Sequence, residues 1–184
     1  MTITAPALVG RTWDDIKEGE SASITRVCTA NDLIVFAHAS GNLNPVHLPG
    51  ESEQETGRAP VAPGMWCAAL FSAVFGNKLP GPGTVYQYQE VRFQSRVQAG
   101  EAVVATVTVR EKLPGNLLVM DCRLEKQDGS LVAEGSAEVS PPQNRLVTDG
   151  VVIPELTLLP RGKFSRLLEA CRGLPAMPTA IAAP

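Results

Sequence analysis

The chain has 184 residues, of which 44% are hydrophobic and 19% charged, a balance typical of a globular protein with one well-packed domain. A formal net charge of −3, without any run of Lys or Arg, argues against a nucleic-acid or anionic-membrane partner. The longest apolar run, residues 65–75, is too short to span a membrane, and the N-terminus lacks a signal-peptide pattern, so a cytoplasmic location is expected.

A short amphipathic helix is predicted to follow a first strand over residues 19–29. Thr29 and Asp32 form a Thr-x-x-Asp pair that resembles a capping box, and apolar residues follow at helical spacing. Turn-forming residues begin at Ser40, so the helix should stop just before it. An ordered loop then carries His47, one of only two histidines in the chain.

Two contrasting stretches come next. Residues 49–60 hold two glycines, three glutamates and no large apolar residue, which predicts an exposed loop beside the His47 turn. This loop is either a mobile lid or a solvated connector with no gating role. Residues 63–76 are apolar on every side and therefore predict a buried central helix, with Pro63 suited to its first position.

The remaining core predicts antiparallel strands. Residues 103–110 and 118–125 alternate between two faces, one of them apolar. Asp128-Gly129 is a hairpin signal, and residues 131–139 then form another inward-facing row. Periodicity alone therefore gives an α+β fold with an antiparallel sheet.

The strand predicted over residues 84–97 has a different pattern. We place Tyr86 and Tyr88 on one face and Val91 and Phe93 on the other, so that apolar groups lie on both faces. Such a strand is either interior or part of a subunit contact. Because one core needs fewer apolar groups than this, we predict a homodimer or a higher homo-oligomer.

The turn after the first helix carries a motif. Phe-Ala-x-x-Ser-Gly-x-x-Asn-Pro-x-His, from Phe36 to His47, resembles the hydratase-2 motif of MaoC-like, (R)-specific enoyl-CoA hydratases. Two further stretches, Gly64-Met-Trp-Cys-Ala-Ala-Leu and Leu79-Pro-Gly-Pro-Gly-Thr-Val-Tyr, are similar to the MaoC-like domain that precedes a phosphate acetyl/butyryltransferase in bifunctional proteins. The resemblance covers residues 10–140 and implies a single hot-dog fold, an antiparallel sheet wrapped around a long central apolar helix.

The end of the chain is expected to differ from this domain. Residues 141–184 are predicted to be a linker and a short amphipathic helix, over residues 161–174. This tail looks like the entry into the acyltransferase domain of the bifunctional proteins. The chain is therefore expected to be a fragment that lacks that domain.

The resemblance also implies a reaction: the reversible addition of water to a trans-2-enoyl-CoA, with the coenzyme A thioester as substrate and no cofactor. In the family an Asp and a His share one water and perform both proton transfers, and His47 matches the His. Asn42 stands at the Asp position, and its amide can orient water but cannot accept a proton at neutral pH. Gly64 matches the glycine whose N–H, at the start of the central helix, donates to the thioester oxygen.

The other candidate site residues either contact the substrate or support those that do: Ser40, Gly41, Asn44, Pro63 and Met65. Pro63 stands where the family usually has a His, which removes a donor near the site. His38 falls at a variable position of the motif and is expected to be exposed and inert.

No metal is expected. The cysteines are widely scattered, with no Cys-x-x-Cys pair and no nearby His: Cys28, Cys67, Cys122 and Cys171. We expect reduced, partly buried thiols, and no Asp/Glu cluster accompanies His47.

Three functions remain open. The first is enoyl-CoA hydration or the reverse dehydration, weakened by Asn42. The second is a non-catalytic acyl-CoA-binding or assembly domain of a phosphate acetyl/butyryltransferase. The third is thioester hydrolysis, because related hot-dog proteins are thioesterases.

Overall fold

The computed structural model describes residues 7–149 and 156–158. Its elements follow in this order: β1 (Leu8–Gly10), β2 (Ser21–Val27), α1 (Ala30–Ser40), the 3₁₀ helix η1 (Pro45–His47), α2 (Glu51–Thr56), α3 (Gly64–Asn77), β3 (Val85–Phe93), β4 (Ala102–Leu113), β5 (Leu117–Lys126), β6 (Leu131–Ser140) and β7 (Leu146–Thr148). No helix among these residues is long and apolar enough to cross a bilayer.

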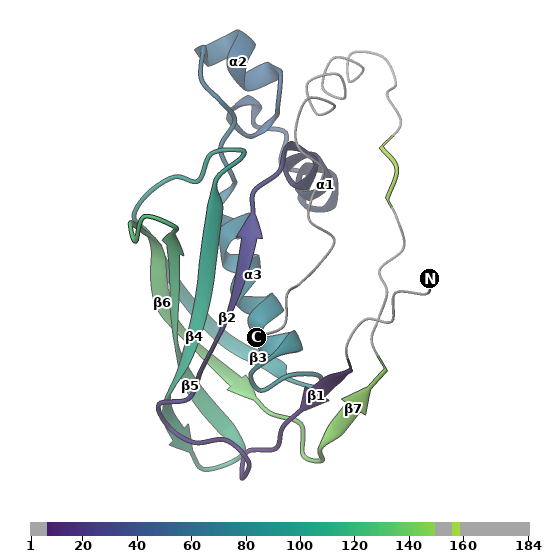
Figure 1. Ribbon diagram of the computed structural model, residues 1–184, viewed down its shortest axis with the longest axis vertical. Coiled ribbons are helices and arrows are strands. Elements are labelled where there is room, and N and C mark those ends of the chain that lie inside the picture. The colour runs from purple at the N-terminus through teal and green to yellow at the C-terminus, as the bar shows by residue number, and fades with distance from the viewer. Residues whose placement is uncertain (1–6, 150–155, 159–184) are drawn as a thin grey trace.

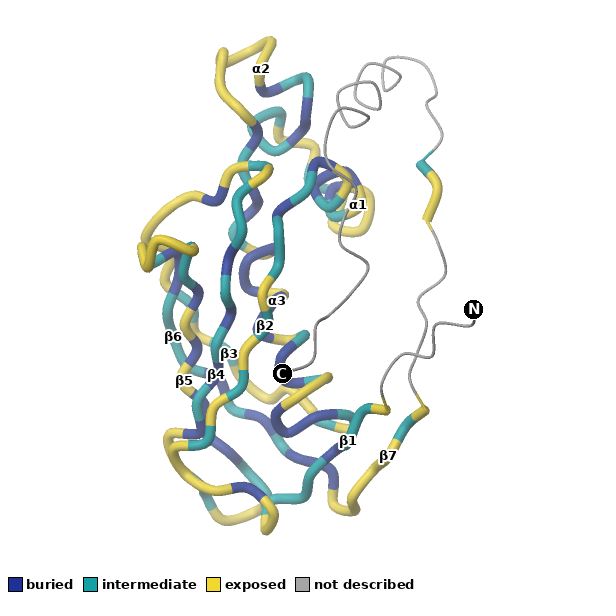
Figure 2. Tube along the Cα trace, viewed as in Figure 1, coloured by how far each residue is buried: buried dark blue, intermediate teal, exposed yellow. Residues whose placement is uncertain are grey.

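Five strands form one antiparallel sheet in the order β2-β4-β5-β6-β3, and α3 lies along its inner face (Figure 1). The alternation that predicted the strands also explains the packing, because the inward residues of β4 and β5 are almost fully buried. Figure 2 shows buried positions along the sheet strands and α3, with exposed residues at α2 and the hairpin loops. The α+β hot-dog arrangement predicted from the sequence is confirmed.

The predicted start of α1 is also confirmed. Thr29 is the N-cap, and its hydroxyl accepts a hydrogen bond from the Asp32 N–H at 3.0 Å. The Asp32 carboxylate accepts in return from the Thr29 N–H at 2.9 Å. This reciprocal pair satisfies two N–H groups that the first helical turn would otherwise leave unbonded.

The stretch between the motif turn and α3 corrects the prediction of a loop, because it contains α2. The Glu53 carboxylate accepts from the Gly50 N–H at 2.6 Å, and Gly57 ends the helix with φ +66°. Ser52 is buried and its hydroxyl donates to the Arg58 carbonyl at 2.9 Å. The polar residues that suggested a loop therefore form a six-residue helix with its own caps and one buried serine.

The strand β3 corrects a second prediction. It lies at the edge of the sheet, so it is not an interior strand. Its register against β6 shifts between Tyr86 and Tyr88, which pair with Val139 and Glu138 respectively. Because this bulge inserts one residue, Tyr86 turns to the buried face and Tyr88 to the outer face. The two tyrosines therefore do not share a face, and Tyr86 lies on the same side as Phe93.

The helix α3 is buried against the sheet, but not on every side. Phe71, Val74 and Phe75 are almost fully buried, whereas Met65 is 65% exposed. Pro63 is the N-cap and lies one residue before the helix rather than at its first position.

The first and last strands of the described residues pair with each other. β1 and β7 form a two-stranded antiparallel ribbon, which lies near the C-terminal end of α3 (Figure 1). β7 falls within the stretch assigned to the linker, and the domain limit at residue 140 stays a prediction. The helix predicted over residues 161–174 lies outside the described residues.

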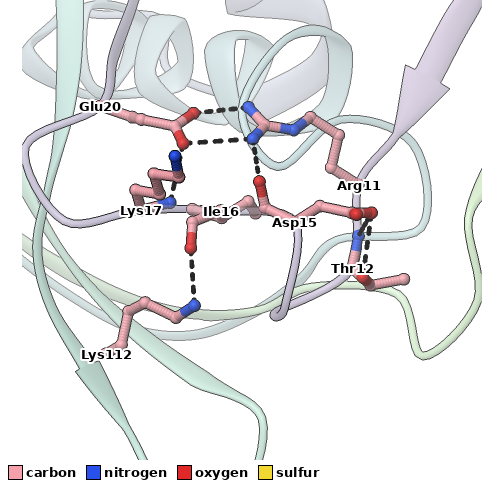
Figure 3. Close-up of polar contacts among 7 residues, drawn as sticks. All are labelled: Arg11, Thr12, Asp15, Ile16, Lys17, Glu20 and Lys112. Carbon is pink, nitrogen blue, oxygen red and sulfur yellow. Dashed lines mark hydrogen bonds and ion pairs between the residues drawn. The ribbon is translucent and has the colours of Figure 1, made fainter.

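A polar cluster holds the segment between β1 and β2 in place (Figure 3). The Arg11 guanidinium donates to both carboxylate oxygens of Glu20, at 2.6 and 3.2 Å, and also to the Asp15 carbonyl. The Lys112 ammonium donates to the Ile16 carbonyl at 2.6 Å. The hydrogen bond between Arg11 and Glu20 raises the pKa of the guanidinium and lowers that of the carboxyl.

Candidate active site

The site begins where α1 ends. Gly41 adopts φ +71°, a left-handed conformation that favours glycine, and its N–H donates to the Ala37 carbonyl at 2.9 Å. The Ser40 hydroxyl donates back to the Phe36 carbonyl at 2.6 Å and accepts from the Asn42 N–H at 3.2 Å. Both residues thus make the turn, while a contact with substrate stays a prediction.

Two asparagines continue the turn. The Asn42 side-chain oxygen accepts from the Asn44 N–H at 3.1 Å. The Asn44 side-chain oxygen accepts in turn from the Val46 N–H at 3.4 Å, which starts η1 at Pro45. The amide nitrogen of Asn42 has no acceptor in the described part of the chain, so it can still donate to a ligand or to water.

His47 is fixed at one ring nitrogen. Its Nδ1 lies 2.8 Å from the Val61 carbonyl oxygen. Because a carbonyl oxygen can only accept, Nδ1 carries the proton in this hydrogen bond. The neutral imidazole then keeps a lone pair at Nε2, which can accept a proton from water.

The segment that holds His47 also leads to α3. The Val61 N–H donates to the Val46 carbonyl at 3.0 Å, so both the N–H and the carbonyl of Val61 are bonded to the motif turn. On its other side the segment pairs with residues 97–99, through Ala62 N–H to Val97 carbonyl at 2.7 Å. Gly64 follows three residues after Val61, which places it within about 10 Å of the carbonyl that His47 binds.

The first turn of α3 offers free donors. Pro63 provides no side-chain cap, and its carbonyl accepts from the Trp66 and Cys67 N–H groups at 3.0 and 3.3 Å. The N–H groups of Gly64 and Met65 have no acceptor among residues 7–149 and 156–158. Unpaired N–H groups and the positive end of the helix dipole both favour an oxygen that gains negative charge.

Phe93 forms a wall next to these donors. A methyl group added at Gly64 would lie 3.0 Å from the edge of the Phe93 ring, closer than nearly all real contacts of this kind. The absence of a side chain at Gly64 therefore leaves room for the ring, which is 46% exposed. Phe93 was not among the predicted site residues, because the bulge that turns β3 is not visible in the sequence.

The thiols are not candidates for nucleophilic chemistry. Cys28, Cys67 and Cys122 are free and buried, as predicted, whereas Cys171 lies outside the described residues. Burial raises the pKa of each of the three to about 12, so they stay protonated at neutral pH. Within the described ranges no group of three or more His, Cys, Asp or Glu side chains could hold a metal ion.

Comparison with known proteins identifies relatives along most of this structure. Residues 13–125 match the family described as the MaoC like domain. The chain is 37% identical over 141 residues to an (R)-specific enoyl-CoA hydratase of Rhodospirillum rubrum, covering 76% of this chain and 98% of the relative. It is 33% identical over 136 residues to a 3-hydroxybutyryl-CoA dehydratase of Methylorubrum extorquens, covering 71% of this chain and 84% of the relative.

A solved structure agrees with the fold. The unliganded R-hydratase PhaJ1 from Pseudomonas aeruginosa superposes with a TM-score of 0.79 at 32% sequence identity. The match covers 83% of this chain and 99% of that structure. The turn that carries His47, the central helix and the strands β2, β3 and β4 all lie within residues 13–125, which match the family.

Proposed function

The chain belongs to the MaoC-like domain family, and from this premise we propose that it is an (R)-specific enoyl-CoA hydratase, which adds water reversibly to a trans-2-enoyl-CoA thioester. One observation carries the proposal: the hydrogen bond from Nδ1 of His47 to the Val61 carbonyl puts the lone pair of the neutral imidazole at Nε2, in a turn bonded to the segment that starts α3. A proton acceptor and a set of oxyanion donors thus belong to one hydrogen-bonded unit.

The reaction can be assigned to these groups. As water attacks the β-carbon, Nε2 of His47 takes one of its protons, and the electrons of the C=C bond move onto the thioester. The Gly64 N–H donates to the oxygen of the resulting enolate, helped by the dipole of α3. The imidazolium then returns its proton to the α-carbon, so water is added without net gain or loss of a proton.

Asn42 defines the limit of this activity. Its side-chain oxygen is bonded to the Asn44 N–H, and its NH₂ group can orient the attacking water. It cannot share the proton transfers, so His47 must perform both. We therefore propose a weak hydratase.

The same residue favours a second candidate function, a domain that binds acyl-CoA without turning it over. A site that keeps its hydrogen-bond donors but lacks one proton acceptor would retain its affinity for acyl-CoA and lose hydration rate. This reading would also suit a domain working beside a phosphate acetyl/butyryltransferase, a finer resemblance that rests on residues 64–70 and 79–86 and stays a prediction.

Crotonyl-CoA separates these functions. Loss of the enoyl absorbance on adding the protein is expected for the hydratase, while calorimetric binding without absorbance change supports the binding domain. Release of free thiol would instead indicate a thioesterase. A protein that neither binds nor converts crotonyl-CoA would contradict all three.

We also propose that the protein is a homodimer that pairs through β3. This edge strand carries Val85, Tyr88 and Phe93, which are 55%, 51% and 46% exposed. An uncovered edge of this length with apolar side chains favours pairing with a second strand. Light scattering should give a mass near twice the 19.5 kDa of one chain, and a monomer would contradict the proposal.

A further inference from the structure

A turn over residues 98–101 leads from β3 into β4. The Glu101 N–H donates to the Gln98 carbonyl at 3.1 Å, and the Glu101 carboxylate accepts in return from the Gln98 N–H at 2.7 Å. Gly100, between them, adopts φ +93°. The other carboxylate oxygen of Glu101 accepts from the ammonium of Lys126, the last residue of β5, at 2.8 Å. One side chain thus holds the turn together and joins it to a neighbouring strand.

The carboxylate of Glu101 is ionised at neutral pH. Burial raises the pKa of this carboxyl, but the hydrogen bonds from the Lys126 ammonium and from the Gln98 N–H lower it below its usual value. Hydrogen bonds to a charged acceptor are stronger than those to a neutral one. The turn therefore depends on this one side chain.

The turn is bonded to the segment that fixes His47. Residues 60–62 pair with residues 97–99 through two backbone hydrogen bonds, at 2.7 and 2.9 Å. Val61 lies between these two bonds, and its carbonyl accepts from Nδ1 of His47 at 2.8 Å. In an extended segment the backbone groups of successive residues point to opposite sides. The bonds to residues 97–99 therefore aim the Val61 carbonyl at the histidine.

The same turn is also bonded to the other arm of the site. The Gly100 N–H donates to the Cys28 carbonyl at 2.7 Å, and the Cys28 N–H donates to the Glu101 carbonyl at 2.9 Å. Cys28 directly precedes Thr29, the N-cap of α1, and the far end of this helix leads to Asn42. One turn thus bonds both segments that carry the candidate reacting groups.

We propose that Glu101 is a positioning residue: by holding the turn at residues 98–101, its carboxylate keeps the Val61 carbonyl on Nδ1 of His47 and the imidazole lone pair at Nε2. Without the carboxylate the Gln98 N–H loses its acceptor, the turn loosens, and either ring nitrogen of His47 can carry the proton. The effect on hydration rests on the proposed function, because it needs His47 as the proton acceptor. The effect on the tautomer can be measured without substrate.

The first test measures the tautomer of His47 by NMR of the ring nitrogens at about pH 8.5, above the ordinary titration range of histidine. The chain has two histidines, so the exposed His38 serves as a reference in every spectrum. In the unaltered protein the proton of His47 should lie on Nδ1. In Glu101→Ala the ratio of the two tautomers should shift toward protonated Nε2 by about two- to tenfold, as expected for a weakened hydrogen bond.

Hydration of crotonyl-CoA is the second readout. The kcat of Glu101→Ala should fall by about tenfold and KM should change less, because the proton acceptor of the chemical step is misplaced. Glu101→Gln keeps an oxygen that can accept from the Gln98 N–H, so it should restore most of the tautomer ratio and of the rate.

Glu125→Ala is the matched control. The side chains of Glu101 and Glu125 are both 34% exposed and both ion-paired, but Glu125 is paired with Arg123 of its own strand, at 2.9 Å. The control should leave the tautomer ratio and the rate unchanged. If Glu101→Ala does not fold, Lys126→Met removes the ammonium from the carboxylate and should give a smaller shift in the same direction.

The possible outcomes separate the two proposals. A tautomer ratio that the Glu101 variant shares with the unaltered protein would overturn the inference, and so would a shift that Glu125→Ala also shows. If the unaltered protein does not convert crotonyl-CoA, the proposed hydratase function is overturned. The tautomer ratio still decides in that case whether Glu101 positions His47.

Discussion

Polar groups gather at the two ends of α3, and they are used in opposite ways. Near the C-terminal end, where the Arg11 N–H donates to the Pro80 carbonyl, the guanidinium is bonded to Glu20 and to the backbone of Asp15 (Figure 3). Near the N-terminal end, His47 is bonded only through Nδ1, and the Gly64 N–H has no acceptor within the described residues.

This difference separates a structural cluster from a site. The N–H groups at the start of α3 and Nε2 of His47 can still bond a ligand or water, whereas the side chains of Arg11 and Glu20 are already bonded to each other. Substitutions in the Arg11–Glu20 cluster, near the C-terminal end of α3, should therefore change the free energy of unfolding without changing catalytic activity. Substitutions near the N-terminal end, at His47 or Gly64, should change catalytic activity more than stability.

The largest effect is expected from His47→Ala. Removing the only proton acceptor assigned to the reaction should lower the hydration rate of crotonyl-CoA by about 10²–10⁴-fold. His38→Ala is the control, because His38 is exposed in the last turn of α1 and should leave the rate unchanged. Equal rates for the two variants would remove His47 from the mechanism.

A gain of about 10²-fold is expected from Asn42→Asp at pH 7. One carboxylate oxygen can keep the bond to the Asn44 N–H, so the turn persists while the second oxygen becomes a proton acceptor. Asn44→Asp adds the same charge two residues away, at a side chain bonded to Val46, and should give no gain. If Asn42→Asp binds crotonyl-CoA yet stays at the background rate, the domain binds acyl-CoA without catalysis.

A smaller loss, about tenfold, is expected from Gly64→Ala, because the new methyl group would push Phe93 away from the donors and misplace the thioester. The change keeps the N–H group, so it tests shape alone. Phe93→Ala in the same chain should restore part of the rate. Gly76→Ala, at a helix position with nothing within 4 Å, should leave the rate intact.

The smallest effect is expected in the Arg11–Glu20 cluster near the C-terminal end of α3. Glu20→Gln should lower the free energy of unfolding at pH 7 by about 1 kcal/mol or less, because the lost ion pair with Arg11 is partly exposed. The folded-state pKa of Glu20 is lowered, so its contribution is present above the unfolded-state pKa and lost as the pH falls through the folded-state pKa. Denaturation of the unaltered protein and of Glu20→Gln should show that their difference in free energy of unfolding vanishes in acid. Their hydration rates should be equal.

Much of the fold was accessible from the sequence because periodicity reports burial directly. The alternation in β4 and β5 and the Thr29–Asp32 capping pair each gave an element that the structure confirms. The errors arose where one local feature changed the pattern. A single bulge after Tyr86 reversed the facing of Val85 and Tyr86 relative to the rest of β3. A buried serine and two capping interactions made a helix of a polar stretch.

The candidate site was accessible only in part, for a different reason. The family resemblance pointed to His47, Asn42 and Gly64 as candidate site residues, because residue types can be matched directly in the sequence. The group that fixes the histidine is the backbone carbonyl of Val61, which carries no sequence signal. Phe93 could be placed beside Gly64 only once the register of β3 was known.

The most direct test is the transfer of solvent protons to the substrate. The unaltered protein is incubated with crotonyl-CoA in heavy water, and the product is examined by NMR for deuterium at the α-carbon. Equilibration over hours reveals even slow turnover. The account predicts deuterium at that carbon in 3-hydroxybutyryl-CoA, and its loss in His47→Ala. Bound crotonyl-CoA that acquires neither a hydroxyl group nor deuterium would contradict it.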